Sequence, residues 1–280
     1  MNGSLHGAGV GARGPHLDAL RARTAASPDA PSWLELLADN HLDPVSARVA
    51  SSLARRYPVA VHAVGMNLGG VDPVDARYLD RLAALIDLVD PVHVSDHVAF
   101  TALDGVHHHD LWPLPHTREV ALHVAARVRE VQERLGRRVL VENISTYARH
   151  AEDDLTEDAF LTTIVEAAGC GLVLDLNNLW VNQHNHGEDA LEVLRRLPLD
   201  RVGYVHLAGH TRSGDLLIDT HDAPVCDAVW GLYSELQRLA PGTPALIEWD
   251  DDLPTFDVMV DHVQRAEALT LAPSAAQVSA

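Results

Sequence analysis

Six side chains of the kinds that bind metal ions recur along the chain, each at or near the end of a short apolar run. Imidazole and carboxylate ligands together suit zinc, iron or manganese, and the lack of a thiolate among them disfavours a structural zinc site. Three acids buried together need compensating positive charge, which cations would supply. The six are His62, His97, Glu142, Asp175, His206 and Glu248. This is more than one ion needs, so we predict two metals, bridged by Glu142 from the middle of the set.

A further acid–histidine pair, Asp219 and His221, stands in the stretch "IDTHD". It follows the seventh apolar run and could hold a third ion, with either Asn178 or His184 as the remaining ligand. His210, in "HLAGH", is expected behind the ligands or against a substrate. Asp222, next to the pair, is expected to cap the helix that follows.

The elements that would position these residues alternate between strand and helix patterns. Helical stripes such as Leu82, Leu85, Ile86 and Val89 separate the apolar runs. Eight strands alternating with helices predict an α/β fold, a TIM-type (β/α)8 barrel, in which the strands' carboxyl ends form the active site. The expected strands are 8–12, 33–37, 59–66, 92–100, 138–144, 171–179, 202–210 and 244–250. We expect a single domain over residues 1–268, a disordered tail over 269–280, and a long connection after the fourth strand.

Composition narrows the function classes. The net charge is −19 and all 21 basic residues are arginines, which disfavours nucleic acid as a partner. The absence of lysine excludes Schiff-base chemistry. Cys170 and Cys226 are expected to be reduced core residues. With neither a targeting segment nor a membrane-spanning run in the sequence, a cytoplasmic protein is expected.

Several motifs together resemble a known family, the multinuclear non-heme iron-dependent oxidative enzymes, whose best-known member acts in methanobactin biosynthesis. The resemblance covers roughly residues 7 to 268. The motifs are "VHAVGMNLGG", "VSDHVAF", "DLWPLPHT", "LVENIST", "CGLVLDLNNLWVNQHNHG", "VHLAGH", "IDTHDAPV", "VWGLY" and "IEWDDDLP". It implies a TIM-type barrel of the xylose isomerase-like kind that binds two or three iron ions.

The resemblance also assigns ligands and chemistry. The first iron would be held by His62, His97 and Glu142. The second would be held by Glu142, Asp175, His206 and Glu248, and the third by Asp219, His221 and Asn178. Glu142, Asp175 and His206 would be the catalytic residues around a mixed-valent Fe(II)/Fe(III) pair. With dioxygen as oxidant, the enzyme would modify a residue, most often cysteine, in a ribosomally made precursor peptide, and a separate small partner protein would recognise the leader of that peptide.

Two departures from the family pattern bear on the substrate. Asp96 stands where the family usually has glutamate, and "DNH" at 39–41 replaces "ENY". Neither touches an expected ligand, but both are expected near the peptide. Similar barrels occur in endonuclease IV-type zinc phosphodiesterases and in xylose isomerases. The first needs a phosphate-binding surface and normally has histidine at position 178, and the second relies on a lysine. A non-catalytic metal-binding protein is the third alternative.

Overall fold

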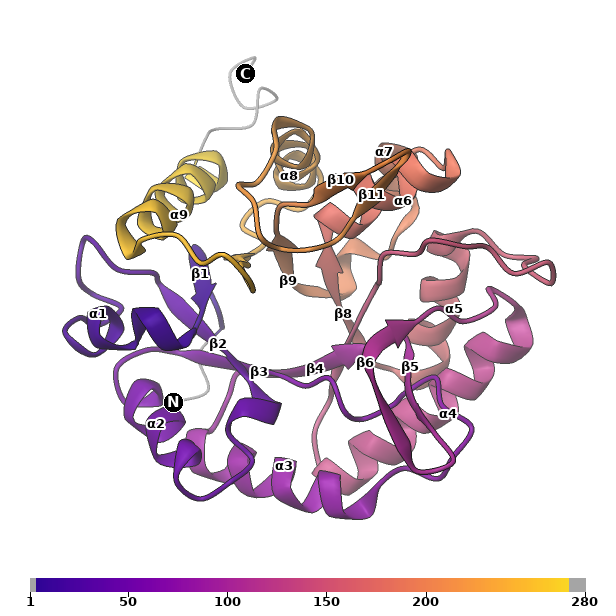
Figure 1. Ribbon diagram of the computed structural model, residues 1–280, viewed down its shortest axis with the longest axis horizontal. Helices are drawn as coiled ribbons and strands as arrows, with labels where there is room; N and C mark the ends of the chain where they lie inside the picture. Colours follow the sequence, from indigo (N-terminus) through magenta and orange to yellow (C-terminus); the bar gives the residue numbers. More distant parts are fainter. Residues whose placement is uncertain (1–3, 272–280) are drawn as a thin grey trace.

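Eight parallel strands close into a barrel at the centre of the molecule (Figure 1). The computed structural model describes residues 4–271. Around the barrel the strands run β1 (Ala8–Gly11), β2 (Trp33–Leu37), β3 (Val59–His62), β4 (His93–His97), β7 (Leu140–Glu142), β8 (Gly171–Asp175), β9 (Val202–Leu207) and β12 (Ala245–Ile247). Each lies within the range expected from sequence, so the predicted (β/α)8 barrel is confirmed.

Helices follow the strands and surround the barrel (Figure 1). The predicted stripe on α3 is buried. Helix α4 is capped at its N-terminus by Thr117, whose hydroxyl accepts from the Val120 amide, and at its C-terminus by Gly136 in the left-handed conformation. The bounds are α1 (Leu17–Arg21), α2 (Ser46–Ala54), α3 (Ala76–Val89), α4 (Arg118–Leu135), α5 (Glu157–Ala168), α6 (Leu176–His186), α7 (Ala190–Arg196), α8 (Asp227–Leu239) and α9 (Phe256–Leu271). Helix α9 thus includes residues 269–271, and the rest of the expected tail, 272–280, lies outside the described residues.

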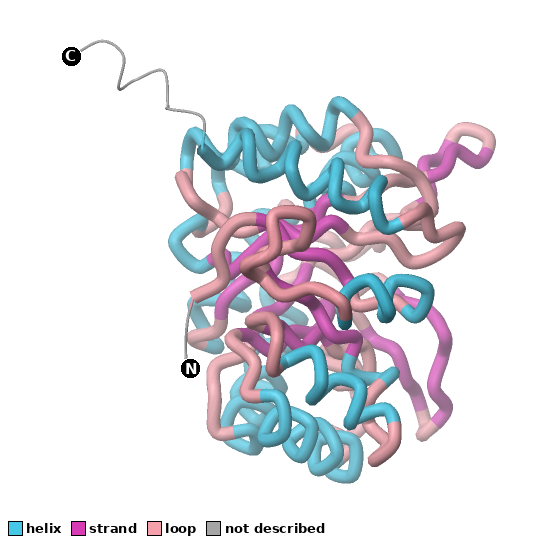
Figure 2. Tube along the Cα trace, turned by 90° about the vertical axis from the view of Figure 1, so that its left-hand side faces the viewer, coloured by secondary structure: helices cyan, strands magenta, loops and turns pink. Residues whose placement is uncertain are grey.

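Two hairpins rise from the carboxyl end of the barrel. One consists of β5 (Phe100–Leu103) and β6 (Val106–Trp112), in the long connection expected after the fourth strand. The other consists of β10 (Thr211–Ser213) and β11 (Leu216–Ile218). Figure 2 shows both on the same side of the molecule. The hairpins therefore flank the end of the barrel at which the predicted site residues gather.

The predicted capping role of Asp222 is wrong. Helix α8 begins at Asp227, with Cys226 as its N-terminal cap. The Asp222 carboxylate instead accepts hydrogen bonds from the hydroxyls of Thr211 and Thr220. Asp222 therefore ties the loop that carries His221 to the start of β10.

An apolar and aromatic layer fills the barrel below the site. Trp33, Leu140, Val173, Tyr204 and Leu246 are all buried within it and form one cluster. This layer is the floor on which the polar carboxyl ends of the strands rest. Among the described residues, no helix has the length and apolarity needed to cross a membrane.

Candidate metal centre

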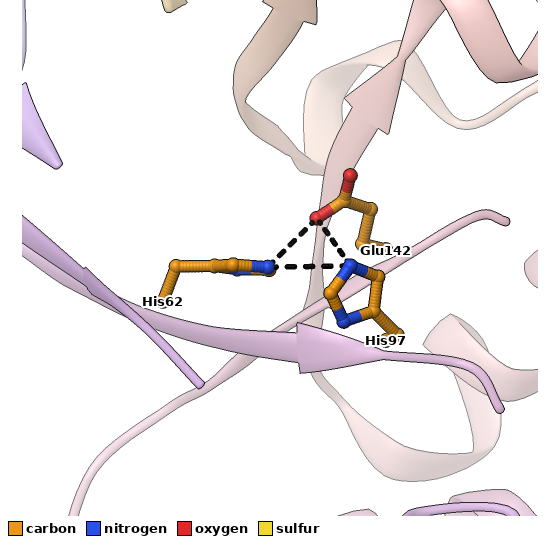
Figure 3. A group of neighbouring side chains, drawn as sticks. All are labelled: His62, His97 and Glu142. Atoms are coloured by element: carbon orange, nitrogen blue, oxygen red, sulfur yellow. Dashed lines mark hydrogen bonds and ion pairs between the residues drawn. The ribbon is translucent and has the colours of Figure 1, made fainter. Parts of the chain in front are cut away.

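Three of the predicted ligands meet at the ends of adjacent strands. His62, His97 and Glu142 are the last residues of β3, β4 and β7, and Figure 3 shows their side chains pointing toward one another. The Nε2 atoms of the two histidines are 3.3 Å apart. Glu142 Oε2 lies 3.4 Å from His62 Nε2 and 3.7 Å from His97 Nε2. These three atoms could hold one metal ion.

Glu142 also belongs to a second group, with Asp175, His206 and Glu248. Asp175 and His206 are register partners at the ends of β8 and β9, and Glu248 directly follows β12. His206 Nδ1 lies 2.9 Å from Glu142 Oε1 and 3.0 Å from Glu248 Oε2. Glu142 thus turns one oxygen to each group, as a bridging carboxylate must. That it bridges two metals stays a prediction.

The third set of predicted ligands is only partly brought together. His221 Nε2 lies 2.7 Å from Asp219 Oδ1 and 3.8 Å from Asp175 Oδ2. Asn178 lines the same cavity. The group that the structure assembles around His221 contains Glu248 and Asp250 instead, with His221 Nδ1 3.3 Å from Asp250 Oδ2.

The backbone of His221 has φ +48°, in the left-handed region that a residue with a side chain adopts at a cost of about 1–3 kcal/mol. Two backbone hydrogen bonds hold it there. The His221 amide donates to the Gly209 carbonyl at 3.2 Å, and its own carbonyl accepts from the Asp250 amide at 2.8 Å. The loop therefore holds the imidazole at the mouth of the barrel in spite of the local strain.

The residues expected around the ligands fall in three different places. The expectation that Asp96 touches no ligand is wrong, because it lies directly behind His97 and accepts from the Met66 amide at 2.7 Å and from the His97 amide at 2.6 Å. His210 Nδ1 lies 2.7 Å from Asn177 Oδ1, next to the third set. His184 is exposed, and its ring is directed at the Asp215 carbonyl in the turn between β10 and β11. It is therefore not brought to the centre, which leaves Asn178 as the neighbour of Asp219 and His221.

Buried polar atoms in the site lack hydrogen bonds among the described residues. They include Glu142 Oε2, Asp175 Oδ2 and Asn178 Oδ1. An unsatisfied buried polar atom costs about 1–3 kcal/mol, and three in one place are not a stable apolar core. Each is an atom with a lone pair that a cation could use. The donor set therefore fits metal ions.

Asp175 shows how the local fold directs one such atom. Its Oδ1 accepts from the Asn178 amide at 2.6 Å and so caps the N-terminus of α6. The Asn143 side chain holds the Asp175 backbone through bonds of 2.8 Å and 3.1 Å. With one oxygen used by the helix, the other, Oδ2, has no hydrogen bond among the described residues and lies 3.8 Å from His221 Nε2.

In the protein without metal, the buried acids and imidazoles of the site shift one another's pKa values. Burial lowers the pKa of His62 to about 3. Burial also acts to lower the pKa of His97, but the Glu142 and Asp96 carboxylates outweigh it and raise that pKa to about 9. Burial and the neighbouring Asp219 carboxylate raise the pKa of Asp175 well above its usual range. Metal ions binding here would displace protons, because imidazole and carboxylate ligands bind metals in their deprotonated forms.

The two histidine–carboxylate groups open into a cavity of about 550 Å3 at the mouth of the barrel. The β5–β6 hairpin lines one wall, and the loop after β11 lines another. From the hairpin come Thr101, His108, Asp110 and Leu111, and from the loop come Asp219, Thr220 and His221. The ligand atoms are thus reachable from solvent on one side and closed by the floor on the other.

A family model for the RiPP precursor modification enzymes MbnB/TglH/ChrH matches residues 7–271. The chain belongs to this family. A UPF0276 protein of Acaryochloris marina is 43% identical over 266 residues, which cover 94% of this chain and 95% of that protein. A UPF0276 protein of Caulobacter vibrioides is 40% identical over 264 residues, 94% and 93% of the two chains. Membership confirms the resemblance found in the sequence and makes the chain a member of a group of peptide-modifying enzymes.

Solved structures similar to this family member share its barrel. An L-ribulose 3-epimerase superposes with a TM-score of 0.64 at 17% identity, covering 98% of both chains. Endonuclease IV from Thermus thermophilus superposes with a TM-score of 0.59 at 18% identity, covering 95% of this chain and 98% of the other. At such identities the likeness shows the fold alone.

Three residues of this family member's site are not among the predicted ligands. Glu35, on β2, contacts His206 Nε2 at 3.1 Å inside the barrel. Asp250 lies in a run of three acids, where spacing gives no means to single out one. Arg13, after β1, forms ion pairs with Asp250 and Glu248. The only signal for Glu35 was its position near the end of a strand, which it shares with the predicted ligands.

Proposed function

We propose that this chain is an iron- and dioxygen-dependent enzyme that oxidatively modifies a residue, with cysteine the expected one, in a ribosomally made precursor peptide. The proposal includes two or three irons and a mixed-valent Fe(II)/Fe(III) pair as the working state. Family membership supports the peptide substrate. The donor set of imidazoles and carboxylates supports a redox-active metal.

The observation that carries the proposal is the geometry of Glu142. Its Oε2 faces His62 and His97, and its Oε1 faces His206. One carboxylate between two ligand groups is the arrangement that places two ions close together in front of one substrate. Iron bound there supplies a redox-active centre with free coordination positions.

The residues of the chain perform binding, orientation and exclusion of water. His62, His97 and Glu142 would hold one iron, and Glu142, Asp175, His206 and Glu248 the other. The third position would use Asp219, His221 and Asn178, and the proximity of Asp250 to His221 makes it a competing ligand there. A cavity of about 550 Å3 admits a side chain and its immediate neighbours but not a folded partner. The hairpins at its rim would contact the peptide backbone.

A small partner protein that recognises the leader remains part of the proposal. Residues 4–271 form one barrel with two short hairpins, and within this range no second domain is present that could bind a leader. The net charge of −19 further disfavours a nucleic acid substrate.

Metal analysis tests the proposal. Protein expressed in iron-rich medium should contain two to three irons per chain, and Glu142→Ala should lose two of them together. Asp158→Asn, a buried acid on α5 away from the cavity, is the matched control and should keep all of them. Zinc without iron would contradict the oxidase and favour a phosphoester or sugar substrate. Loss of a single ion from Glu142→Ala would show that this residue does not bridge.

The peptide chemistry is tested by co-expression. A short cysteine-containing peptide and a small partner protein, sought among the neighbouring open reading frames, are produced with the enzyme, and the peptide mass is measured. A mass change confined to a cysteine-containing fragment, dependent on iron and dioxygen, is expected. An unmodified peptide from cells in which the enzyme carries its full iron content would refute the assigned substrate.

A further inference from the structure

A continuous chain of hydrogen bonds runs beneath the cavity and joins the two ligand groups. His62 Nδ1 lies 2.8 Å from Ser95 Oγ, which lies 2.9 Å from the Tyr204 hydroxyl. Tyr204 donates to Glu35 Oε2 at 2.7 Å, and the same oxygen lies 3.1 Å from His206 Nε2. All five side chains are buried, none more than 2% exposed.

The number of protons in this chain fixes its direction. Tyr204 has one hydroxyl proton, and it goes to the Glu35 carboxylate, which can only accept. Ser95 must then donate to the Tyr204 oxygen, and with its proton used it can only accept from His62 Nδ1–H. At the other end, His206 Nε2–H donates to Glu35. In every hydrogen bond of this chain, the donor is therefore the group farther from Glu35 and the acceptor is the group nearer to it.

This direction determines which nitrogen of each histidine has a free lone pair. In His62 it is Nε2, which faces Glu142 Oε2 at 3.4 Å. In His206 it is Nδ1, which faces Glu142 Oε1 at 2.9 Å. We propose that Glu35 is a positioning residue that, through Tyr204 and Ser95, fixes the metal-facing nitrogen of one histidine in each ligand group. This inference rests on the metal-binding part of the proposed function.

Aromatic residues around Tyr204 hold this chain of hydrogen bonds in place. Trp33 packs edge-on against Tyr204, with ring centroids 5.2 Å apart, and His93 stacks on the same ring at 6.0 Å. A side chain at Gly9 would meet the Trp33 ring at 2.5 Å, so this close packing requires glycine there. A buried carboxylate is unfavourable unless it is hydrogen-bonded, and here both bonds come from groups that lead to ligands.

Three conservative variants distinguish the effect on His62 from the effect on His206, the two ends of the hydrogen-bond chain. Tyr204→Phe and Ser95→Ala remove the links to His62 but leave the contact between Glu35 and His206. Glu35→Gln removes the charge that His206 donates to. Tyr233→Phe is the matched control, because its hydroxyl is also bonded, to Thr270 Oγ1 at 2.8 Å, but lies between α8 and α9 outside the barrel.

Anaerobic titration with Fe(II), followed by Mössbauer spectroscopy of the ⁵⁷Fe-loaded protein, gives the readout. Iron affinity at the His62 group should fall roughly 10- to 100-fold in Tyr204→Phe and Ser95→Ala, and at both groups in Glu35→Gln. Tyr204→Phe and Ser95→Ala should therefore alter the iron signal of the His62 group alone, whereas Glu35→Gln should alter the signals of both groups. The double variant of Ser95 and Tyr204 should bind iron no more weakly than the weaker single variant, because Tyr204 acts on the orientation of His62 through Ser95.

Wild-type iron affinity and spectra in Tyr204→Phe, with a loss of thermal stability like that of Tyr233→Phe, would overturn the inference. If Tyr204→Phe does not fold, Ser95→Ala decides by the same criteria. The titration can be repeated with Co(II) or Zn(II). If the iron-loaded protein oxidises no peptide, the proposed function is contradicted, while the affinity for Co(II) or Zn(II) in the same variants still tests the role of Glu35.

Discussion

The carboxyl of Glu157 should make the stability of the protein depend on pH. Glu157 lies at the start of α5, 4% exposed, and accepts hydrogen bonds from Asn182 at 3.1 Å and Asn143 at 3.4 Å. Burial raises its pKa from 4.5 to about 7. Since the folded protein binds this proton more tightly than the unfolded chain, the contribution to stability is complete below about pH 4.5 and is lost as the pH rises through 7.

The magnitude follows from the shift. A change of about 2.5 pH units corresponds to about 3 kcal/mol, since each unit is worth about 1.4 kcal/mol. The glutamine in Glu157→Gln cannot ionise. The free energy of unfolding of this variant, relative to that of wild type, should therefore rise by about this much between pH 4.5 and pH 8. In a chain of this size the difference in melting temperature should grow by roughly 6 to 12 °C over that range.

Thermal unfolding of both proteins, followed by circular dichroism at a series of pH values, measures this difference. Glu166→Gln, at an exposed position on the same helix, is the control and should run parallel to wild type. Parallel profiles for Glu157→Gln and wild type would refute the reasoning, because they would show that the carboxyl titrates alike in the folded and unfolded chains.

Two further predictions concern the loop that carries His221. Gly209→Ala would place a side-chain carbon against the Ala223 carbonyl, so the loop must shift and the third ion should be lost while the other two remain, as metal analysis would show. Asp219→Asn and Asp250→Asn distinguish the two candidate ligand sets of the third ion. If the predicted set is right, the Asp219 variant should lose this ion and the Asp250 variant should retain it, and the reverse result would assign the site to the acid that follows β12.

The barrel could be predicted because its strands are short apolar runs separated by helical stripes, a local pattern. The residue at which each strand ends could not be predicted. The predicted strand 59–66 ends at His62 in the structure, because the next residues leave the sheet while several, including Met66, remain buried. Apolar character alone does not separate a strand from a buried loop.

The β5–β6 hairpin was missed although a signal for it exists. Asp104 and Gly105 both have positive φ, at 51° and 72°, and Asp-Gly between apolar residues is typical of a two-residue hairpin turn. The strand that follows the turn, β6, contains three consecutive histidines and therefore lacks the apolar alternation that is typical of a strand. The turn, but not β6, was therefore within reach of the sequence.

The candidate ligands were found because strand ends of a parallel barrel meet at one mouth. The parts not found depend on contacts distant in sequence. Glu35 and Tyr204 form a hydrogen bond although they are 169 positions apart in the sequence. Asp222 bonds to Thr211 rather than to the helix that follows it. Patterns within one segment carry no information on such partners.

Asp175 serves α6 and the candidate metal group with different oxygens, and this has a consequence for metal affinity. A flexible ligand loses rotational freedom when an ion binds, which weakens binding. Here the cap has already immobilised the carboxylate during folding, so the entropic loss is not repeated at coordination. The barrel therefore presents a preorganised ligand to the ion, and selection among metals would depend on ligand geometry more than on the ability of the site to close around each of them.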